Sequence, residues 1–339
     1  MKCELSLDNE FFQNIKTFTF PLPEGASALP NLIRYILSAI YNIVILLLSK
    51  KEEILIYNFN NPLSLAILNK LNVFLRRKII IFCHGELELL ITKEGGGLAK
   101  LLRYFINSFF FSNKSLYLRF CVLGDVIIEN LKPIIGEKID YFFSIDHPYE
   151  FAKDDVQAKN QRLSLPLRMA TIGTLNKFKG IDLFLELAKT VKKENLDVTL
   201  SVIGNVSNRK EELENLEVKI HGKGELLERE ELDRAISNID YILFFYSEDK
   251  YKITASGAIF DAIKWRKPII AMKNDYFLYL FEKYGSIGFL CKDIHQMEQQ
   301  IKQILENQNQ YQYNFDRYIS KLSTREFTEK IIKLIKLCY

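Results

Sequence analysis

The stretch TASGAIFDAIKWRKPIIA, residues 254–271, carries the clearest local signals in this chain. Thr254 is predicted to cap a helix, because a threonine oxygen can accept a hydrogen bond from the first helical turn. Small residues follow, and their free N–H groups would attract a phosphate. Asp261 lies one turn beyond Gly257, so it can share a face with Ser256 and Gly257. This spacing favours equally a ligand site and an ordinary capped helix with an exposed aspartate.

Glycine-bearing loops end three of the strands predicted before this stretch. They are Ile172-Gly173-Thr174, Ile203-Gly204-Asn205 and His221-Gly222-Lys223. Ligands of open α/β sheets bind beyond the carboxyl ends of the strands, where glycine permits close approach of the backbone. A single such loop is more often an ordinary turn, but their repetition favours a ligand-binding edge formed by Gly173, Thr174, Gly204 and Gly222.

Strands and helices alternate through both halves of the 339 residues, which is typical of an α/β fold with parallel sheets. The polar stretch at 150–162 separates the halves. We predict a first domain at 1–155 and a second at 163–314, with a helix at 315–339 that crosses back to the first domain. Predicted strands are 15–20, 54–57, 78–82, 116–122 and 139–143, then 169–172, 198–203, 218–221, 241–245, 268–271 and 287–290. Predicted helices in the first half are 29–48, 62–75, 98–111 and 124–134.

The composition excludes several classes of protein. Hydrophobic residues make up 48% and charged residues 26%, so a disordered chain is not expected. The 46 basic and 42 acidic residues are too balanced for a dedicated nucleic-acid binder. The five cysteines lie far apart, without the spacing of a zinc site or a disulfide framework, which favours a reducing cytoplasm and no bound metal.

Two apolar segments raise the question of a membrane. Residues 35–48 are shorter than the roughly 20 residues of a spanning helix, and we expect a buried helix rather than a membrane insertion. Residues 101–119 interleave aromatic side chains with Arg103, Lys114 and Arg119. This segment is expected to contribute mostly to the core, with docking on an anionic bilayer as the alternative. The amino terminus lacks the pattern of a signal peptide, so we expect a cytoplasmic protein, with a place at the inner face of the membrane if docking occurs.

The second half resembles the sugar-nucleotide domain of the GT-B glycosyltransferases, and most of all the retaining group. The resemblance rests on the order of IGTLNKFKGIDLFLELA at 172–188, the His221-Gly222 loop, DYILFF at 240–245 and SGAIFDAIKWRKPIIA at 256–271. It implies two Rossmann-like domains that face a cleft. It also implies that Lys179 contacts donor phosphates, that Ser256 and Gly257 lie beneath the diphosphate, and that Asp261 holds the ribose.

Two positions depart from the pattern of that family. Ile253 stands where the first acid of an E-x7-E motif is expected, and an arginine common before the lysine is replaced near Thr174. Glu248 or Asp249 is an alternative source of the displaced acid.

In the first half, the strand IIIFC at 79–83 runs into His84-Gly85-Glu86. His and Glu move protons or bind sugar hydroxyls near neutral pH, although a single histidine is more often structural. The loop resembles the histidine-containing loop of the GT-B acceptor domain. Glu24 and Gly25, after the first predicted strand, form a weaker acceptor candidate.

Together with these residues, the resemblance implies a metal-independent glycosyltransferase that needs no cofactor. The expected donor is a nucleoside-diphosphate sugar, and the expected acceptor is a glycan or lipid-linked saccharide of bacterial surface polysaccharide synthesis. His84, Glu86 and Lys179 are the candidate catalytic residues, with Glu86 as the base if the reaction inverts configuration. A GT-B epimerase and a non-catalytic sugar-nucleotide-binding protein are the alternatives.

Overall fold

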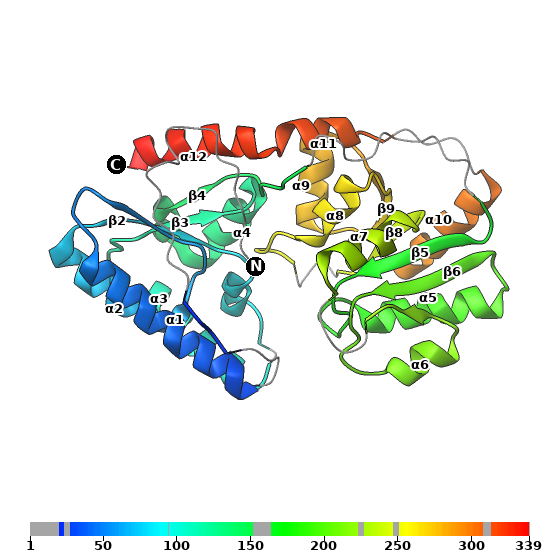
Figure 1. Cartoon of the computed structure of the whole chain (residues 1–339), viewed down its shortest axis with the longest axis horizontal. Helices are drawn as coiled ribbons and strands as arrows, with labels where there is room; N and C mark the ends of the chain where they lie inside the picture. Colours follow the sequence, from blue (N-terminus) through cyan, green and yellow to red (C-terminus); the bar gives the residue numbers. More distant parts are fainter. Residues whose placement is uncertain are drawn as a thin grey trace.

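Two separate parallel β-sheets organise the protein (Figure 1). The computed structural model describes residues 20–23, 28–93, 95–151, 164–222, 227–246, 251–307 and 313–338. The strand predicted at 15–20 lies outside these residues except for Phe20. The parallel sheets confirm the predicted α/β class.

The first sheet has the strand order β1-β2-β3-β4. Its strands are β1 (Ile54–Tyr57), β2 (Lys78–Phe82), β3 (Arg119–Val122) and β4 (Phe142–Ser144). The helices of this half are α1 (Ala28–Leu48), α2 (Pro62–Leu75), the 3-10 helix η2 (Glu86–Leu90), α3 (Gly97–Ser112), α4 (Asp125–Ile135) and the 3-10 helix η3 (Gly136–Tyr141). The predicted strands 116–122 and 139–143 are therefore shorter than expected at their amino ends.

Local signals explain where α2 begins. The side chain of Asn61 accepts a hydrogen bond from the N–H of Leu63, and Pro62 occupies the first turn, where a missing N–H has no cost. The backbone N–H of Arg76, in the left-handed region, closes the other end by donating to Asn72. The predicted bounds of this helix are confirmed.

The second sheet has the strand order β10-β9-β8-β5-β6-β7. Its strands are β5 (Leu167–Ile172), β6 (Val198–Ile203), β7 (Lys219–Ile220), β8 (Tyr241–Phe244), β9 (Ile269–Met272) and β10 (Gly288–Cys291). Its helices are α5 (Ile181–Lys193), α6 (Lys210–Asn215), α7 (Arg229–Ser237), α8 (Ala258–Lys264), α9 (Asp275–Tyr284) and α10 (Ile294–Glu306).

The end of the chain returns to the first sheet. α11 (Phe315–Lys321) packs on the second half, and α12 (Thr324–Cys338) lies along β3 and β4 (Figure 1). Ile331 and Ile335 of α12 are buried against Ile80 and Phe82 of β2. Ile79 and Ile81 point to the other face, toward α1, α2 and α3. Alternate residues of this strand therefore fill two separate cores.

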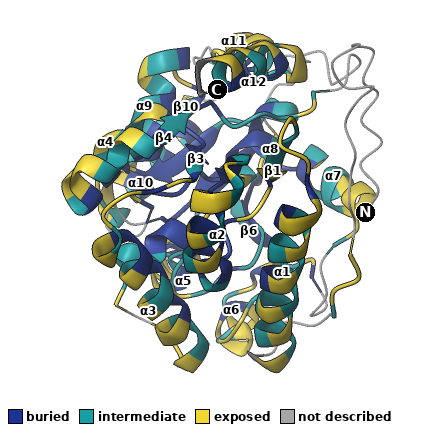
Figure 2. Ribbon diagram, turned by 90° about the vertical axis from the view of Figure 1, so that its left-hand side faces the viewer, coloured by how far each residue is buried: buried dark blue, intermediate teal, exposed yellow. Residues whose placement is uncertain are grey.

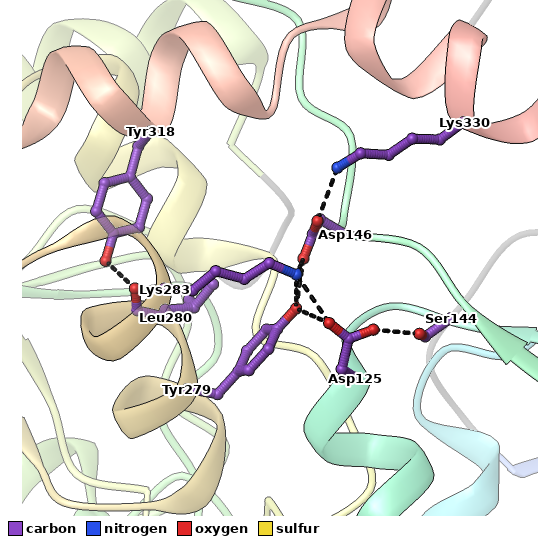
Figure 3. Close-up of polar contacts among 8 residues, drawn as sticks. All are labelled: Asp125, Ser144, Asp146, Tyr279, Leu280, Lys283, Tyr318 and Lys330. Carbon is purple, nitrogen blue, oxygen red and sulfur yellow. Dashed lines mark hydrogen bonds and ion pairs between the residues drawn. The ribbon is translucent and has the colours of Figure 1, made fainter.

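A polar cluster ties the two halves together (Figure 3). Nζ of Lys283, on α9, lies 2.9 Å from Asp146 and 2.8 Å from Asp125 of the first half. Lys330 of α12 binds the other oxygen of Asp146 at 2.9 Å, and the hydroxyl of Tyr279 donates to this carboxylate. Although burial opposes it, these partners lower the pKa of Asp146 to about 2. The cluster therefore holds α4, α9 and α12 together by charge.

The helix expected to be buried at 35–48 is only partly buried, and this prediction is wrong. In Figure 2, α1 is drawn mostly in the colours of exposed and intermediate residues. Only 11% of the apolar window Leu29–Leu48 is buried, and by length and composition alone the helix could cross a membrane. The physical reason is its position: α1 packs on α2 along one side, while Ile33, Ile40 and Val44 on the other side stay exposed.

Candidate functional site

The strand order of the second sheet reverses at β5, which is a switch point where open α/β sheets bind ligands. Lys179, in the loop before α5, lies at this point. Its Nζ is 6.0 Å from the centre of the Tyr246 ring, just after β8. It is also 3.1 Å from the place that a Cβ on Gly173 would occupy, so a side chain at Gly173 would crowd the ammonium.

Lys179 is a half-buried cation without a carboxylate partner among the described residues. Burial alone lowers its pKa, because a low-dielectric environment disfavours the charged form. A cation whose pKa is lowered by burial at such a position is a candidate for ligand binding. The ligand that best suits it is an anion.

The glycines of the three loops are explained first by packing of backbone on backbone. A Cβ on Gly204, whose φ is +141°, would stand 2.3 Å from the carbonyl oxygen of Gly173. A Cβ on Gly222 would stand 2.2 Å from the oxygen of Gly204. The loops do meet at one edge of the sheet, with Thr174 between the paired backbones. Gly204 and Gly222 would be needed there even without a ligand.

The stretch at 254–257 differs from its prediction, because Thr254 caps no helix. α8 begins at Ala258, and Gly257 takes the N-cap position without a side-chain hydrogen bond. The reason lies in the first half of the chain, where Ile253 is fully buried in the core that surrounds Leu87. This anchor holds Thr254 against the first half and away from the start of α8. Ser256 is buried, whereas a Cβ on Gly257 would meet no atom within 4 Å.

Two glycine-to-alanine substitutions test whether each glycine is needed for packing. Gly204→Ala is expected to destabilise the protein by about 2 kcal/mol or more, because it forces a strained φ and a backbone clash. Gly257→Ala should melt as the parent does, since its φ of −67° suits alanine and the space is open. Thermal melts test both expectations. An unstable Gly257→Ala protein would contradict the open space described here.

Asp261 lies on α8 in a network that joins both halves. Its Oδ1 accepts hydrogen bonds from the Tyr149 hydroxyl at 2.6 Å and from Nη1 of Arg229 at 2.8 Å. The hydroxyl of Tyr149 in turn accepts from Nη2 of Arg229 at 2.6 Å. Oδ2 accepts no hydrogen bond from the part of the chain that the structure describes. Sequence reasoning missed Tyr149 and Arg229.

His84 and Glu86 line a groove of about 660 Å³ in the first half, together with Tyr35 of α1 and the start of α3. Nε2 of His84 lies 3.1 Å from the carbonyl oxygen of Asn58, so this nitrogen carries the proton and donates. Burial lowers the pKa of His84, which keeps the ring neutral at pH 7.

Glu86 is held by the backbone on both sides of its carboxyl group. Oε1 accepts from the N–H of Asn60 at 3.1 Å, and Oε2 accepts from the N–H of His84 at 3.0 Å. Burial raises the pKa of Glu86 to about 7, against the opposing effect of these hydrogen bonds. A carboxyl group with such a pKa can exchange a proton near neutrality, and its bonds also fix the shape of the loop.

Glu88, two residues further, was not singled out by sequence reasoning, yet it reaches the second half of the chain. Its Oε1 accepts a hydrogen bond from the N–H of Ile253 at 3.0 Å, and a Cβ on Gly85 would lie 3.7 Å from Cγ2 of Thr254 in the same region. The His84 loop therefore lies directly against the stretch that leads into α8. Burial raises the pKa of Glu88 to about 7.

Some of the predicted features stay untested. Glu24 and Gly25 lie outside the described residues, as do Glu248 and Asp249. Within the described residues, no group of three or more His, Cys, Asp and Glu side chains could hold a metal ion.

Residues 166–307 match the family of group 1 glycosyl transferases. Among curated proteins, none matches the chain by sequence. The protein resembles the structure of Anabaena HepE in complex with UDP-glucose with a TM-score of 0.63 and 11% identity, over 91% of this chain and 84% of that one. The chain has the GT-B fold.

Other GT-B structures support the same conclusion. WaaG, a glycosyltransferase involved in lipopolysaccharide biosynthesis, gives a TM-score of 0.59 at 14% identity, over 93% of this chain and 85% of that one. The lipopolysaccharide outer core galactosyltransferase WaaB gives a TM-score of 0.55 at 16% identity, over 89% of this chain and 81% of that one. By contrast, the chain spans only 55% of the length of S. aureus TarM, with a TM-score of 0.47 and 15% identity over 76% of this chain.

Proposed function

We propose that this protein transfers a sugar from a nucleoside-diphosphate sugar to a glycan or lipid-linked saccharide. The observation that carries the proposal is Lys179, a half-buried ammonium at the switch point of the second sheet with no carboxylate partner among the described residues. A diphosphate would supply the missing negative charge. The match of residues 166–307 to group 1 glycosyl transferases and the UDP-glucose in HepE agree with such a donor.

Charge stabilisation by the protein suffices for this chemistry. The diphosphate leaving group gains negative charge as its bond to the sugar breaks, and a preorganised lysine with nearby N–H groups can stabilise it. Lys179 takes that role, and the open backbone at Gly257 offers room for the phosphates. We therefore propose a metal-independent transfer. Donor hydrolysis or transfer in the presence of a chelator measures this directly.

The acceptor is proposed to bind in the groove of the first half, beside His84 and Glu86. The carboxyl group of Glu86 already accepts two backbone hydrogen bonds, which hold it in place. It is therefore better suited to line the groove than to act as a base. We therefore favour retention of configuration, with the leaving phosphate taking the acceptor proton and His84 orienting the sugar. Glu86 is the base in the inverting alternative, and anomeric analysis of the product decides between them.

Calorimetry with UDP-, GDP- and dTDP-sugars tests the proposal as a whole. One of these donors is expected to bind the folded protein, and turnover is expected only when a saccharide acceptor is added. Conversion of the donor without any acceptor would identify an epimerase instead. If a folded sample bound none of the three classes, the proposed function would fail.

Asp261→Asn is expected to weaken donor binding about tenfold, since a charge-assisted hydrogen bond is worth roughly 1.5–3 kcal/mol and 1.4 kcal/mol is one decade. We propose that Oδ2 accepts from the ribose hydroxyls, while Oδ1 stays with Tyr149 and Arg229. Arg229 is 47% exposed whereas Asp261 is 13% exposed, so solvent screens this ion pair in part and the melting temperature should fall only slightly.

Asp233→Asn is the matched control. Oδ1 of Asp233 lies 3.1 Å from Nη2 of Arg229, so Arg229 loses a carboxylate partner in this variant too. Both substitutions remove one negative charge. Its donor affinity should equal that of the parent. Equal donor affinities in the parent, Asp261→Asn and Asp233→Asn would mean that Asp261 does not bind the ribose.

A further inference from the structure

One oxygen of the Asp261 carboxylate is held by a closed ring of hydrogen bonds. An arginine can only donate such bonds, an ionised carboxylate can only accept them, and a tyrosine hydroxyl does both. Nη2 of Arg229 donates to the hydroxyl of Tyr149, which donates to Oδ1 of Asp261, each at 2.6 Å. Nη1 of Arg229 donates to the same oxygen at 2.8 Å. The direction of every bond in the ring is therefore fixed.

Tyr149 is fixed on α8, the helix that carries Asp261. The rings of Tyr149 and His147 both stack on the ring of Phe260, with 5.9 and 4.5 Å between the ring centroids. Phe260 is fully buried and precedes Asp261 on this helix. The backbone N–H of Tyr149 also donates to the carbonyl oxygen of Leu322 at 3.2 Å. The hydroxyl of Tyr149 therefore meets the carboxylate from a packed position.

The other donor in the ring is held less firmly, because the side chain of Arg229 is 47% exposed. Burial and the neighbouring Asp261 raise the pKa of Tyr149 above its ordinary value, so its hydroxyl keeps the proton that it donates. The torsion that turns a carboxylate about its own axis is soft, and two donors on Oδ1 select one orientation. Oδ2 is left without a hydrogen bond from the described residues, on a side chain that is 13% exposed.

We propose that Tyr149 is a positioning residue for the donor, which orients the carboxylate of Asp261 so that Oδ2 meets the ribose hydroxyls. This step rests on the proposed function, in which Asp261 binds the ribose. Residues 166–307 match the group 1 glycosyl transferases, and Tyr149 lies outside them. The donor site of this chain is therefore completed by a side chain from the segment that leads out of the first sheet.

A positioning role differs in its consequences from a purely structural one. If Tyr149 only tied the two halves of the chain together, its loss would weaken every ligand of the second half by the same factor. If it orients Asp261, its loss weakens only those ligands that carry ribose hydroxyls. The two roles can therefore be separated by a ligand that lacks these hydroxyls.

Calorimetry with a nucleoside diphosphate and its 2′,3′-dideoxy analogue makes this comparison. The pair follows the base that the donor calorimetry selects, which for uridine means UDP and 2′,3′-dideoxy-UDP. Tyr149→Phe keeps the stacked ring and removes the hydroxyl, so it should weaken UDP binding about fivefold, the loss expected for one hydrogen bond. Its affinity for the dideoxy analogue should equal that of the parent. In the Asp261→Asn background, Tyr149→Phe should cause no further loss.

Tyr279→Phe is the matched control. Its hydroxyl also joins the two halves, by donating to Asp146, but it takes no part in the ring of bonds around Asp261. The Tyr279→Phe protein should therefore bind both nucleotides as the parent does.

Several outcomes would overturn the inference. Unchanged UDP binding by Tyr149→Phe would remove this tyrosine from the donor site. An equal loss for both nucleotides, or the same loss in Tyr279→Phe, would assign the effect to the link between the halves. Equal affinities of the parent for the two nucleotides would reject the ribose contact but leave the donor class in place. A folded parent that bound none of the three donor classes would instead fail the proposed function itself.

Discussion

Lys179→Ala is expected to lower kcat by about 100-fold while changing donor affinity far less, as is found when one preorganised charge or hydrogen-bond donor is removed from a site of developing negative charge. The ammonium lies at the switch point between β5 and β8, and burial already lowers its pKa. Its charge is therefore costly in the free protein and is stabilised most when the diphosphate departs. Measured kcat, donor Kd and melting temperature together test the expectation.

Lys177→Ala provides the control for this substitution. Lys177 belongs to the same loop but is exposed, so it should leave kcat, donor affinity and the melting temperature unchanged. The Lys179→Ala protein should melt at least as high as the parent, because it removes a half-buried charge without a carboxylate partner among the described residues. An unchanged kcat in the folded Lys179→Ala protein would remove this lysine from the mechanism.

The sequence was most informative where the signal is local. The Asn61-Pro62 pair predicts the start of α2, and the apolar runs at 54–57, 78–82 and 198–203 coincide with β1, β2 and β6. A parallel strand that is buried on both faces consists of consecutive apolar residues, so it can be recognised in the sequence alone. The GT-B resemblance likewise came from the order of these elements in the second half.

The sequence failed where a residue's surroundings come from far along the chain. Asp261 and Tyr149 are 112 positions apart, and the N–H of Ile253 bonds to Glu88 across 165 positions. No periodicity within a window of a dozen residues encodes such contacts. The same cause explains the error at Thr254, because burial of Ile253 in the first half overrides the capping preference of the threonine.

The error at α1 has a different origin. Its apolar composition predicts burial as readily as it predicts contact with lipid, since both environments exclude water. Only the placement of α1 at the side of the sheet, with Leu46 inward and Leu47 outward, distinguishes the two. The glycines illustrate the same limit. From the sequence, Gly204 is a candidate for ligand binding, but in the structure glycine is needed there because a Cβ would clash with the carbonyl oxygen of Gly173.

Glu88→Gln is expected to stabilise the protein above pH 7 and to leave it unchanged below pH 4. Burial raises the pKa of Glu88 from 4.5 to about 7, so the folded state holds a proton that the unfolded state has already released. The stabilisation by this proton is complete below pH 4.5 and is lost as the pH rises through 7. Glutamine can accept the same hydrogen bond from the N–H of Ile253 without ever carrying the charge.

The shift corresponds to about 3 kcal/mol, at 1.36 kcal/mol for each pH unit between 4.5 and 7. Lys252 and Tyr251 lie close enough to influence Glu88, and Lys252 opposes the shift. Melting curves of the parent and of Glu88→Gln between pH 4 and 8 should therefore converge at low pH and separate as the pH rises.

Glu86→Gln is the companion variant, with a similar pKa shift in the parent but hydrogen bonds confined to the first half of the chain. Parallel curves for the parent and Glu88→Gln at every pH would mean that the pKa of Glu88 is not shifted by folding. Glu88 would then be ionised at neutral pH, and its contact with Ile253 would join the two halves as a charged hydrogen bond.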